Sequence, residues 1–288
     1  MSTAALVPSA ATVRKRNWLT HWSLAGKLGL AVIAFWGAVA LVAPFLPVAL
    51  GEMSDAGVFE GVSVQHWLGT DYLGRDMLVR IVAGTPYTIG VALVATLIAC
   101  TLGAVPGLLA AVAGGWLDQA ISRFLDTLIS IPSKMLSLVI IAGFGSSVPL
   151  LIAVAAIVYT PGCFRIIRSL AVNINAMDYV VVARARGERR PYIMRREILP
   201  NIAGPLLADM GLRFVYALRL LASLSFLGLG VQPPMADWGS LVRENLGALP
   251  VGGAAVLAPA LAIATLTIAV TLVIDNLPGH TDADRETH

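Results

Sequence analysis

The sequence predicts an all-α fold, a polytopic transmembrane helical bundle with six spans. Of the 288 residues, 57% are hydrophobic and only 13% are charged, against about 45–50% and 25% in soluble proteins. The apolar residues gather in runs of about 20, the length that crosses a hydrocarbon core. The net charge is only +3, and the basic residues do not line one polar face, which argues against nucleic acid as a partner.

The first span is predicted over residues 24–50. The segment before it, residues 1–23, carries a basic triplet at 14–16, as a secretory signal does. The apolar stretch of a signal is only about 7–15 residues long, so we interpret this much longer run as an uncleaved membrane helix. A polar loop outside the membrane follows over residues 51–83.

Residues 84–274 form the predicted core, which holds the other five spans. The second span covers Gly84–Ala113 and contains Pro86 and Pro106, which lipid-embedded helices tolerate where neighbours or water satisfy the freed backbone groups. The third span is predicted over Phe124–Phe144 and is entered through Pro132. The fourth, fifth and sixth spans are predicted over Val148–Phe164, Ile198–Leu229 and Ala254–Ile274.

The orientation follows from Lys and Arg in the short loops, which favour the cytoplasm. Residues 165–197 carry eight arginines and three acidic residues, and the start of the chain carries four basic residues and no acid. Six crossings place both segments on one side, so both termini, including the tail 275–288, are expected in the cytoplasm. The predicted location is the cytoplasmic (inner) membrane, with membrane lipid as a partner.

The basic segment contains a predicted helix–turn–helix. We expect Tyr179–Arg186 to be a short helix that Gly187 ends in a left-handed conformation, and Pro191 to open the next helix. The small residues Ala183, Ala185 and Gly187 would form a shallow face, surrounded by arginines, that another protein could approach. The alternative is a basic anchor on anionic lipid, with about 1 kcal/mol from each basic residue.

The fifth span contains three charged residues, Asp209, Arg213 and Arg219. Asp209 and Arg213 are four residues apart, so they lie on one helical face and can pair. A charge at the centre of a span costs from about 2.5 kcal/mol upward unless it pairs or faces water. One hypothesis places all three residues on the solute path, facing a peptide carboxylate. The other makes the pair structural and lets Arg219 reach the membrane surface.

No metal site is expected. The acidic residues of segment 71–76 have only His66 beside them as a further ligand type, so we favour an amphipathic surface segment that touches a partner. Cys100 and Cys163 lie in apolar stretches and are interpreted as small buried hydrophobic residues.

Four motifs stand out along the chain. They are ARARG at 183–187 with ILPN at 198–201, LGTDYLGRD at 68–76, SLSFLGLGVQPP at 223–234 and DWG at 237–239. In this order, over Trp67–Ile274, they resemble the permease subunits of binding-protein-dependent ABC importers, in the dipeptide/oligopeptide/nickel branch. The chain departs from the family pattern at Val181 and Val182, where Glu and Ala are usual, and at Glu197, where His is usual.

The resemblance implies an ABC importer permease fold and a transport function. With a second, homologous permease, the chain would form the path for di- or oligopeptides or related small solutes. Residues 165–197 would be a coupling loop that docks on an ATPase. The docking residues it implies are Tyr179, Ala183, Ala185, Gly187, Glu188 and Pro200. Two ATP-binding subunits and an extracytoplasmic solute-binding protein are the further implied partners.

The sequence lacks the motif that cradles nucleotide phosphates, Gly-x-x-x-x-Gly-Lys-Ser/Thr. We therefore expect partner subunits to hydrolyse ATP and this chain to bind no cofactor. No Ser/His/Asp, Cys/His or paired-carboxylate set stands out, so no catalytic residue is predicted and the chain is not expected to be an enzyme. The residues also leave open an ion-coupled secondary transporter, which would work without an ATPase partner.

Overall fold

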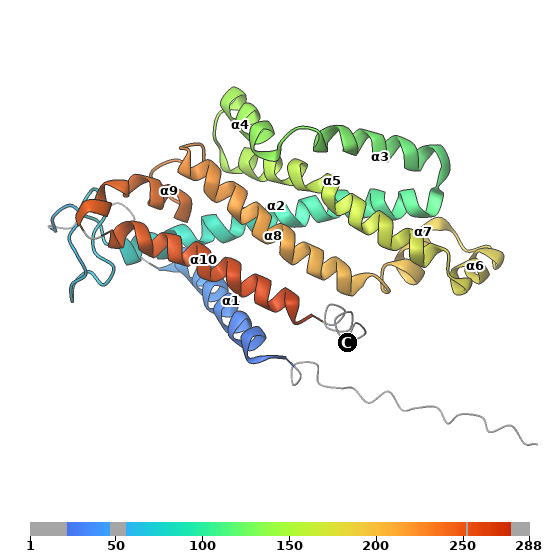
Figure 1. Ribbon diagram of the computed structural model, residues 1–288, viewed down its shortest axis with the longest axis horizontal. Helices are drawn as coiled ribbons and strands as arrows, with labels where there is room; N and C mark the ends of the chain where they lie inside the picture. The colour runs from blue at the N-terminus through green and yellow to red at the C-terminus, as the bar shows by residue number, and fades with distance from the viewer. Residues whose placement is uncertain (1–21, 47–55, 252, 278–288) are drawn as a thin grey trace, which may run out of the picture.

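The computed structural model describes residues 22–46, 56–251 and 253–277. These residues form an elongated bundle of helices that run mostly along one long axis (Figure 1). Within these ranges there is no β-strand, and the only extended pairing is an isolated bridge between Thr70 and Asp76. The all-α prediction is confirmed.

Four of the described helices are long and apolar enough to cross a membrane. The longest has 37 residues, or about 55 Å at 1.5 Å per residue, which exceeds the hydrocarbon core of about 30 Å. The four are α1 (Leu24–Val42, continued by the short η2, Ala43–Phe45), α2 (Met77–Ala113), α5 (Val148–Asn175) and α10 (Ala254–Asp275).

The third predicted span is not one straight helix. Helix α3 (Gly115–Ile129) and helix α4 (Ser133–Phe144) meet at an angle of 79°. Pro132 lies at the break; it lacks a backbone N–H and disfavours helical geometry at the preceding residue. The predicted span over Phe124–Phe144 is therefore interrupted by a bend, and the α3–α4 pair is apolar enough to be either one broken span or a re-entrant segment.

Other predicted boundaries shift by up to eleven residues. Helix α2 begins at Met77 instead of Gly84, because the Asp76 side chain caps it by accepting from the Val79 N–H at 3.1 Å. Helix α5 continues beyond Phe164 to Asn175, so the first part of the basic segment is helical. The end of the first predicted span, residues 47–50, lies outside the described residues.

Helix α8 (Ala203–Phe226) corresponds to the fifth predicted span and is shorter than Ile198–Leu229. It carries three charged residues, so it does not count among the four apolar helices. With the bent α3–α4 pair and α8 added to those four, the number of crossings would be six. This number stays a prediction.

The short elements lie at the two ends of the bundle (Figure 1). One end holds α6 (Asp178–Ala185), α7 (Arg190–Tyr192) and the π-helical η3 (Ile193–Ile198). The other end holds α9 (Trp238–Glu244) and η4 (Leu246–Val251). We call these the α6 end and the α9 end.

Close packing between helices depends on small residues. A Cβ atom at Gly103 of α2 would lie 2.7 Å from the Cys163 Cβ atom of α5, so only glycine permits this approach. Helix α1 packs beside α10 (Figure 1), and the hydroxyl of Ser23 donates to Asn276 Oδ1 at 2.8 Å. The start of α1 and the end of α10 therefore lie on the same side of the bundle.

Candidate functional sites

The α6 turn has the local geometry that the sequence predicts. Helix α6 ends in a Schellman cap, in which the Glu188 N–H donates to the Ala183 carbonyl at 3.2 Å and the Gly187 N–H donates to Arg184 at 2.9 Å. Gly187 has a φ of +85°, and Pro191 lies in the first turn of α7. The helix, the left-handed glycine and the proline-initiated helix are confirmed.

Ala183 does not lie on the exposed face of this turn. It has 0% exposure, as does Val180 one turn earlier, because these two positions form the inner stripe of a short amphipathic helix. The prediction that Ala183 contributes to a shallow outer face is therefore wrong. Of the other residues proposed for docking, Tyr179, Ala185, Gly187 and Pro200 are exposed and Glu188 is half-buried.

The outer face of the α6 turn is apolar as well as basic. Val181 and Val182 are 53% and 54% exposed, and Tyr179 and Tyr192 are also exposed. Exposed apolar groups rimmed by charge are typical of a protein-binding surface.

The turn is attached to the bundle through Asn175, at the end of α5. The Arg184 guanidinium donates to Asn175 Oδ1, and Asn175 Nδ2 donates to the Ala111 carbonyl of α2 at 2.9 Å. These two hydrogen bonds connect α6 to the ends of α5 and α2.

Asp209 and Arg213 form a buried, two-pronged ion pair on α8. Arg213 Nε donates to Asp209 Oδ2 at 2.6 Å, and a terminal nitrogen of Arg213 donates to Oδ1 at 2.9 Å. Another terminal nitrogen of Arg213 donates to the Tyr159 carbonyl of α5 at 3.1 Å. Such bidentate pairs are the strongest of the charge-assisted contacts, so the pair joins α8 to α5, as the structural hypothesis requires.

Two cavities border the same face of α5 and α8. One, of about 260 Å³, is lined by Ser133, Tyr159, Arg165 and Arg213 among others. The second, of about 320 Å³, is lined by Ser133, Lys134, Tyr159, Tyr216, Arg219 and Leu220. Arg213 and Arg219 thus face space that a solute could enter, whereas Asp209 lines neither cavity. Lys134, at the start of α4, joins this set without having been singled out by the sequence as a path residue.

The two cysteines are buried, as predicted, and lie together beside Asp209. Ligand atoms of Cys100, Cys163 and Asp209 all fall within 4.8 Å of one another. Sequence spacing could not indicate this group, because α2, α5 and α8 each contribute one member. Both oxygens of Asp209 already accept from Arg213, whose positive charge opposes a cation at this place.

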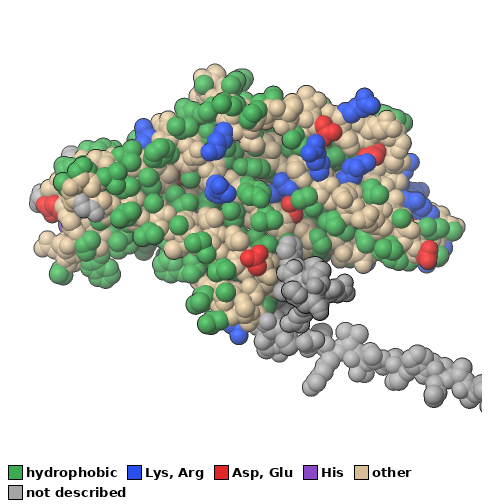
Figure 2. Space-filling view, viewed as in Figure 1, with side chains coloured by type: hydrophobic (Ala, Val, Ile, Leu, Met, Phe, Trp, Pro, Cys, Tyr) green, Lys and Arg blue, Asp and Glu red, His purple; other side chains and the backbone are tan. Residues whose placement is uncertain are grey.

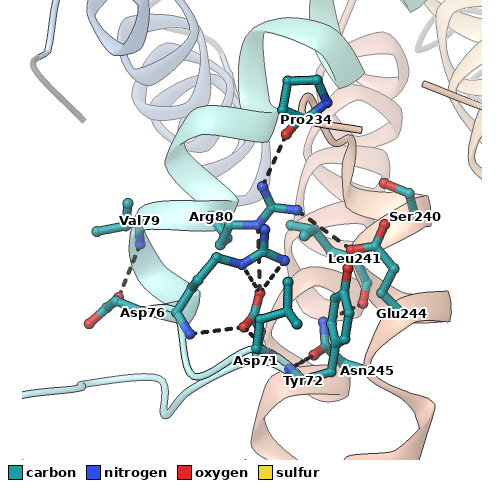
Figure 3. Close-up of polar contacts among 12 residues, drawn as sticks. Asp71, Tyr72, Asp76, Val79, Arg80, Pro234, Ser240, Leu241, Glu244 and Asn245 are labelled. Carbon is teal, nitrogen blue, oxygen red and sulfur yellow. Dashed lines mark hydrogen bonds and ion pairs between the residues drawn. The ribbon is translucent and has the colours of Figure 1, made fainter. Parts of the chain in front are cut away.

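At the α9 end, segment 71–76 is held inside a polar cluster (Figure 3). Asp71 has 0% exposure; its Oδ1 accepts from the Leu73 and Arg75 N–H groups, both at 2.9 Å, and its Oδ2 accepts from Arg75 Nε at 2.7 Å. The prediction of a surface segment is wrong for Asp71, because this carboxylate organises the turn from within.

The same cluster ties the loop to α9. The Tyr72 N–H donates to Asn245 Oδ1 at 3.0 Å, and Arg80 lies 3.5 Å from Glu244 Oε2 and 3.8 Å from Asp71 Oδ2. Figure 3 shows Arg80 of α2 between these carboxylates and the Pro234 carbonyl. Burial raises the pKa of Glu244, although Arg80 opposes the shift. No sequence signal marked Glu244 or Asn245.

The motifs 223–234 and 237–239 meet at Asp237, which caps α9. Its Oδ1 accepts from the Ser240 N–H at 2.9 Å and its Oδ2 accepts from the Ser225 hydroxyl at 2.5 Å. Trp238, with 0% exposure, donates from its indole nitrogen to the Ile81 carbonyl at 3.1 Å. The α9 end is therefore one packed unit built from segments about 150 residues apart in sequence.

Comparison with known proteins agrees with this architecture. The sequence profile of the family described as "Binding-protein-dependent transport system inner membrane component" matches residues 103–281. The chain is 32% identical over 251 residues to the dipeptide transport system permease protein DppC of Alkalihalophilus pseudofirmus, covering 87% of this chain and 83% of the relative. It is 34% identical over 218 residues to the glutathione transport system permease protein GsiD of Pectobacterium atrosepticum, covering 76% and 72%. This chain is a multi-pass membrane protein that belongs to the family of binding-protein-dependent transport system inner membrane components.

Proposed function

We propose that this chain is one of two permease subunits of an ATP-driven importer for di- or oligopeptides or similar small solutes. The observation that carries the proposal is the exposed α6 turn, which joins α5 and α2 at the end opposite the packed α9 cluster. Relatives named for dipeptide and glutathione transport support the solute class.

In this proposal the α6 end faces the cytoplasm and both termini lie on that side. Two ATP-binding subunits would dock on the two permeases, one on each α6 turn, and an extracytoplasmic solute-binding protein would meet the α9 end. The exposed docking residues on this chain are Tyr179, Ala185 and Gly187, with Glu188 and Pro200 at the edge. ATP would be hydrolysed by the partner subunits, and the chain itself would bind no cofactor.

Coupling requires that the ATPase bind two permease conformations with different affinity, since a ligand shifts an equilibrium only by its differential affinity. The α6 turn is suited to this role because its inner residues, Val180 and Ala183, are packed into the bundle. Movement of the docked subunit would shift the ends of α5 and α2 through Arg184 and Asn175.

Replacement of Gly187 by Trp tests the proposal. Gly187 has a φ of +85° and open space around it, so the change would distort the docking surface without an internal clash. Gly145→Trp is the matched control, because Gly145 has a φ of +83° and equally open surroundings between α4 and α5.

The readout is ATP-driven uptake in proteoliposomes that contain the complete importer. Gly187→Trp should lower uptake by about tenfold or more, equivalent to about 1.4 kcal/mol of lost coupling, while the chain remains in the membrane. Gly145→Trp should retain uptake within about twofold of wild type, a difference of less than about 0.5 kcal/mol. Unchanged uptake in Gly187→Trp, or full transport by a preparation without any ATP-binding subunit, would contradict the proposal.

A further inference from the structure

The two cavities beside α5 and α8 adjoin, because Ser133 and Tyr159 line both. We call the combined hollow the basic groove, and the residues that define it here are Ser133, Lys134, Tyr159, Arg165, Arg213 and Arg219. It lies between the start of α4 and the middle of α5 and α8. Blue side chains gather over this middle part of the molecule in Figure 2.

The basic groove has a one-sided charge. Its lining includes four basic side chains and no Asp or Glu. Arg165 is balanced by Asp126 at 2.6 Å and Arg213 by Asp209 at 2.6 Å. Lys134 and Arg219 form no ion pair with any described residue. Two positive charges therefore remain uncompensated within the described part of the chain.

The apolar walls of the basic groove strengthen the electric field of these two charges. The ring centroids of Tyr159 and Tyr216 lie 6.3 Å apart beside the groove, and the Tyr159 hydroxyl donates to the Tyr216 carbonyl at 2.9 Å. Apolar, poorly polarisable walls concentrate the field of nearby charges into a cleft. Anions are enriched in such a cleft, and cations are depleted.

We propose that the basic groove is a solute-facing wall that favours anionic solutes, namely small peptides with more carboxylates than amines. This inference rests on the proposed import function. It assigns selectivity to Lys134 and Arg219, while the Asp209–Arg213 pair holds α8 against α5. The groove and the outer clusters are thus given separate roles, charge selection and partner contact.

The reaction rates of a thiol introduced at Ser133 with charged reagents report the electrostatic potential in the basic groove. Ser133 is exposed and lines both cavities, and serine-to-cysteine is nearly isosteric. Native Cys100 and Cys163 have 4% and 0% exposure and give little background. The reagents are a sulfonate-bearing and a trimethylammonium-bearing methanethiosulfonate, applied to membrane vesicles that hold the complete importer. Ala120→Cys, at an exposed site on α3 outside both cavities, is the matched control.

The sulfonate-to-ammonium rate ratio should be about tenfold higher for Ser133→Cys than for Ala120→Cys, given typical field focusing in charged clefts. Adding Lys134→Gln and Arg219→Gln should return the Ser133→Cys ratio to the control value. Equal ratios at the two thiols, or a raised ratio that does not respond to these substitutions, would overturn the proposal.

Uptake then distinguishes soluble solutes from anionic lipid headgroups as the occupants. With Ala-Glu and Ala-Gln as probes, the Lys134→Gln/Arg219→Gln variant should show a ratio of Ala-Glu to Ala-Gln uptake about fivefold lower than wild type, about 1 kcal/mol. A raised thiol ratio with unchanged peptide preference would assign the groove to lipid and overturn the solute proposal. Absence of ATP-driven uptake of either peptide in wild type would count against the importer function. The sulfonate-to-ammonium rate ratio at the Ser133→Cys thiol would still test whether the basic groove attracts anions.

Discussion

The carboxylate of Asp71, with no exposed surface, pairs with the Arg75 guanidinium at 2.6 Å. The pair closes a turn of five residues, from Asp71 to Arg75, and its position beside α9 fixes the loop that precedes α2. Removing one partner of a buried ion pair costs far more folding free energy than removing one partner of an exposed pair, because neither water nor a counter-ion replaces the lost contact.

Asp71→Asn should therefore destabilise the α9 end by about 3–5 kcal/mol. Asp126→Asn is the control, since the Asp126–Arg165 pair is about half-exposed and should contribute less than about 1 kcal/mol. The measurement is thermal unfolding of the purified protein in detergent. Similar losses in the two variants would show that the Asp71 network is not the stronger element.

Glu244 should make the stability of the same end depend on pH. Burial raises its pKa, so the folded state keeps the proton to a higher pH than the unfolded chain, whose glutamates titrate near pH 4.3. The resulting stabilisation is full below about pH 4 and is lost as pH rises through the raised pKa. Asp237, whose pKa burial also raises, contributes with the same sign.

The check is the unfolding temperature of wild type and Glu244→Gln between pH 4 and 8. The wild-type curve should fall relative to the variant as pH increases, because glutamine has no proton to lose. A constant difference across the range would be inconsistent with a raised pKa at Glu244.

Gly103 should tolerate substitution much less well than Gly90 on the same helix. An added Cβ atom at Gly103 would lie 2.7 Å from Cys163 Cβ and 2.8 Å from the Thr160 carbonyl oxygen, whereas Gly90 has no atom within 4 Å of such a Cβ. Gly103→Ala should cost about 1–3 kcal/mol through overpacking of α2 against α5.

Gly90→Ala should be neutral or stabilise by up to about 1 kcal/mol, because alanine is the better helix former. Thermal unfolding of the two purified variants compares them directly. A greater loss at Gly90 than at Gly103 would refute the close approach of α2 to α5.

Two neighbouring alanines should separate folding from docking. Ala183 is buried and Ala185 is exposed, so Ala183→Glu places a charge inside the bundle at a cost of about 3 kcal/mol or more. Ala185→Glu should leave thermal stability within about 0.5 kcal/mol and weaken co-purification of the ATP-binding subunit. A loss of stability in Ala185→Glu and a loss of co-purification alone in Ala183→Glu would contradict the inner and outer faces assigned to α6.

The sequence predicted local features best where one residue type decides them. Gly187 and Pro191 determine the α6 turn through backbone geometry, and both predictions are confirmed. Predicted helix ends were wrong where a contact with a distant segment sets the end of the helix. Helix α5 extends past Arg165 and Arg168, because Asp126 and Asp118 of α3 balance their charges. Hydropathy alone assigned these arginines to a loop.

The functional sites were predictable in the same uneven way. Arg213 and Arg219 were singled out because a charge in an apolar run is conspicuous, and both line cavities. Lys134 and Glu244 lie near helix ends, where charged residues are ordinary, so only the folded structure shows what they face. The burial of Asp71 and Ala183 also depends on packing between segments far apart in the chain.

The bend between α3 and α4 restricts how a single copy can lie in a bilayer. Helical hydrogen bonding stops at Ser130 and resumes from Pro132, and acyl chains offer nothing to peptide groups left over at such a break. That segment must therefore meet water or another protein. A copy with lipid packed against this bend would leave these peptide groups without hydrogen-bond partners, so the bend excludes lipid from this side unless water or a partner protein covers it.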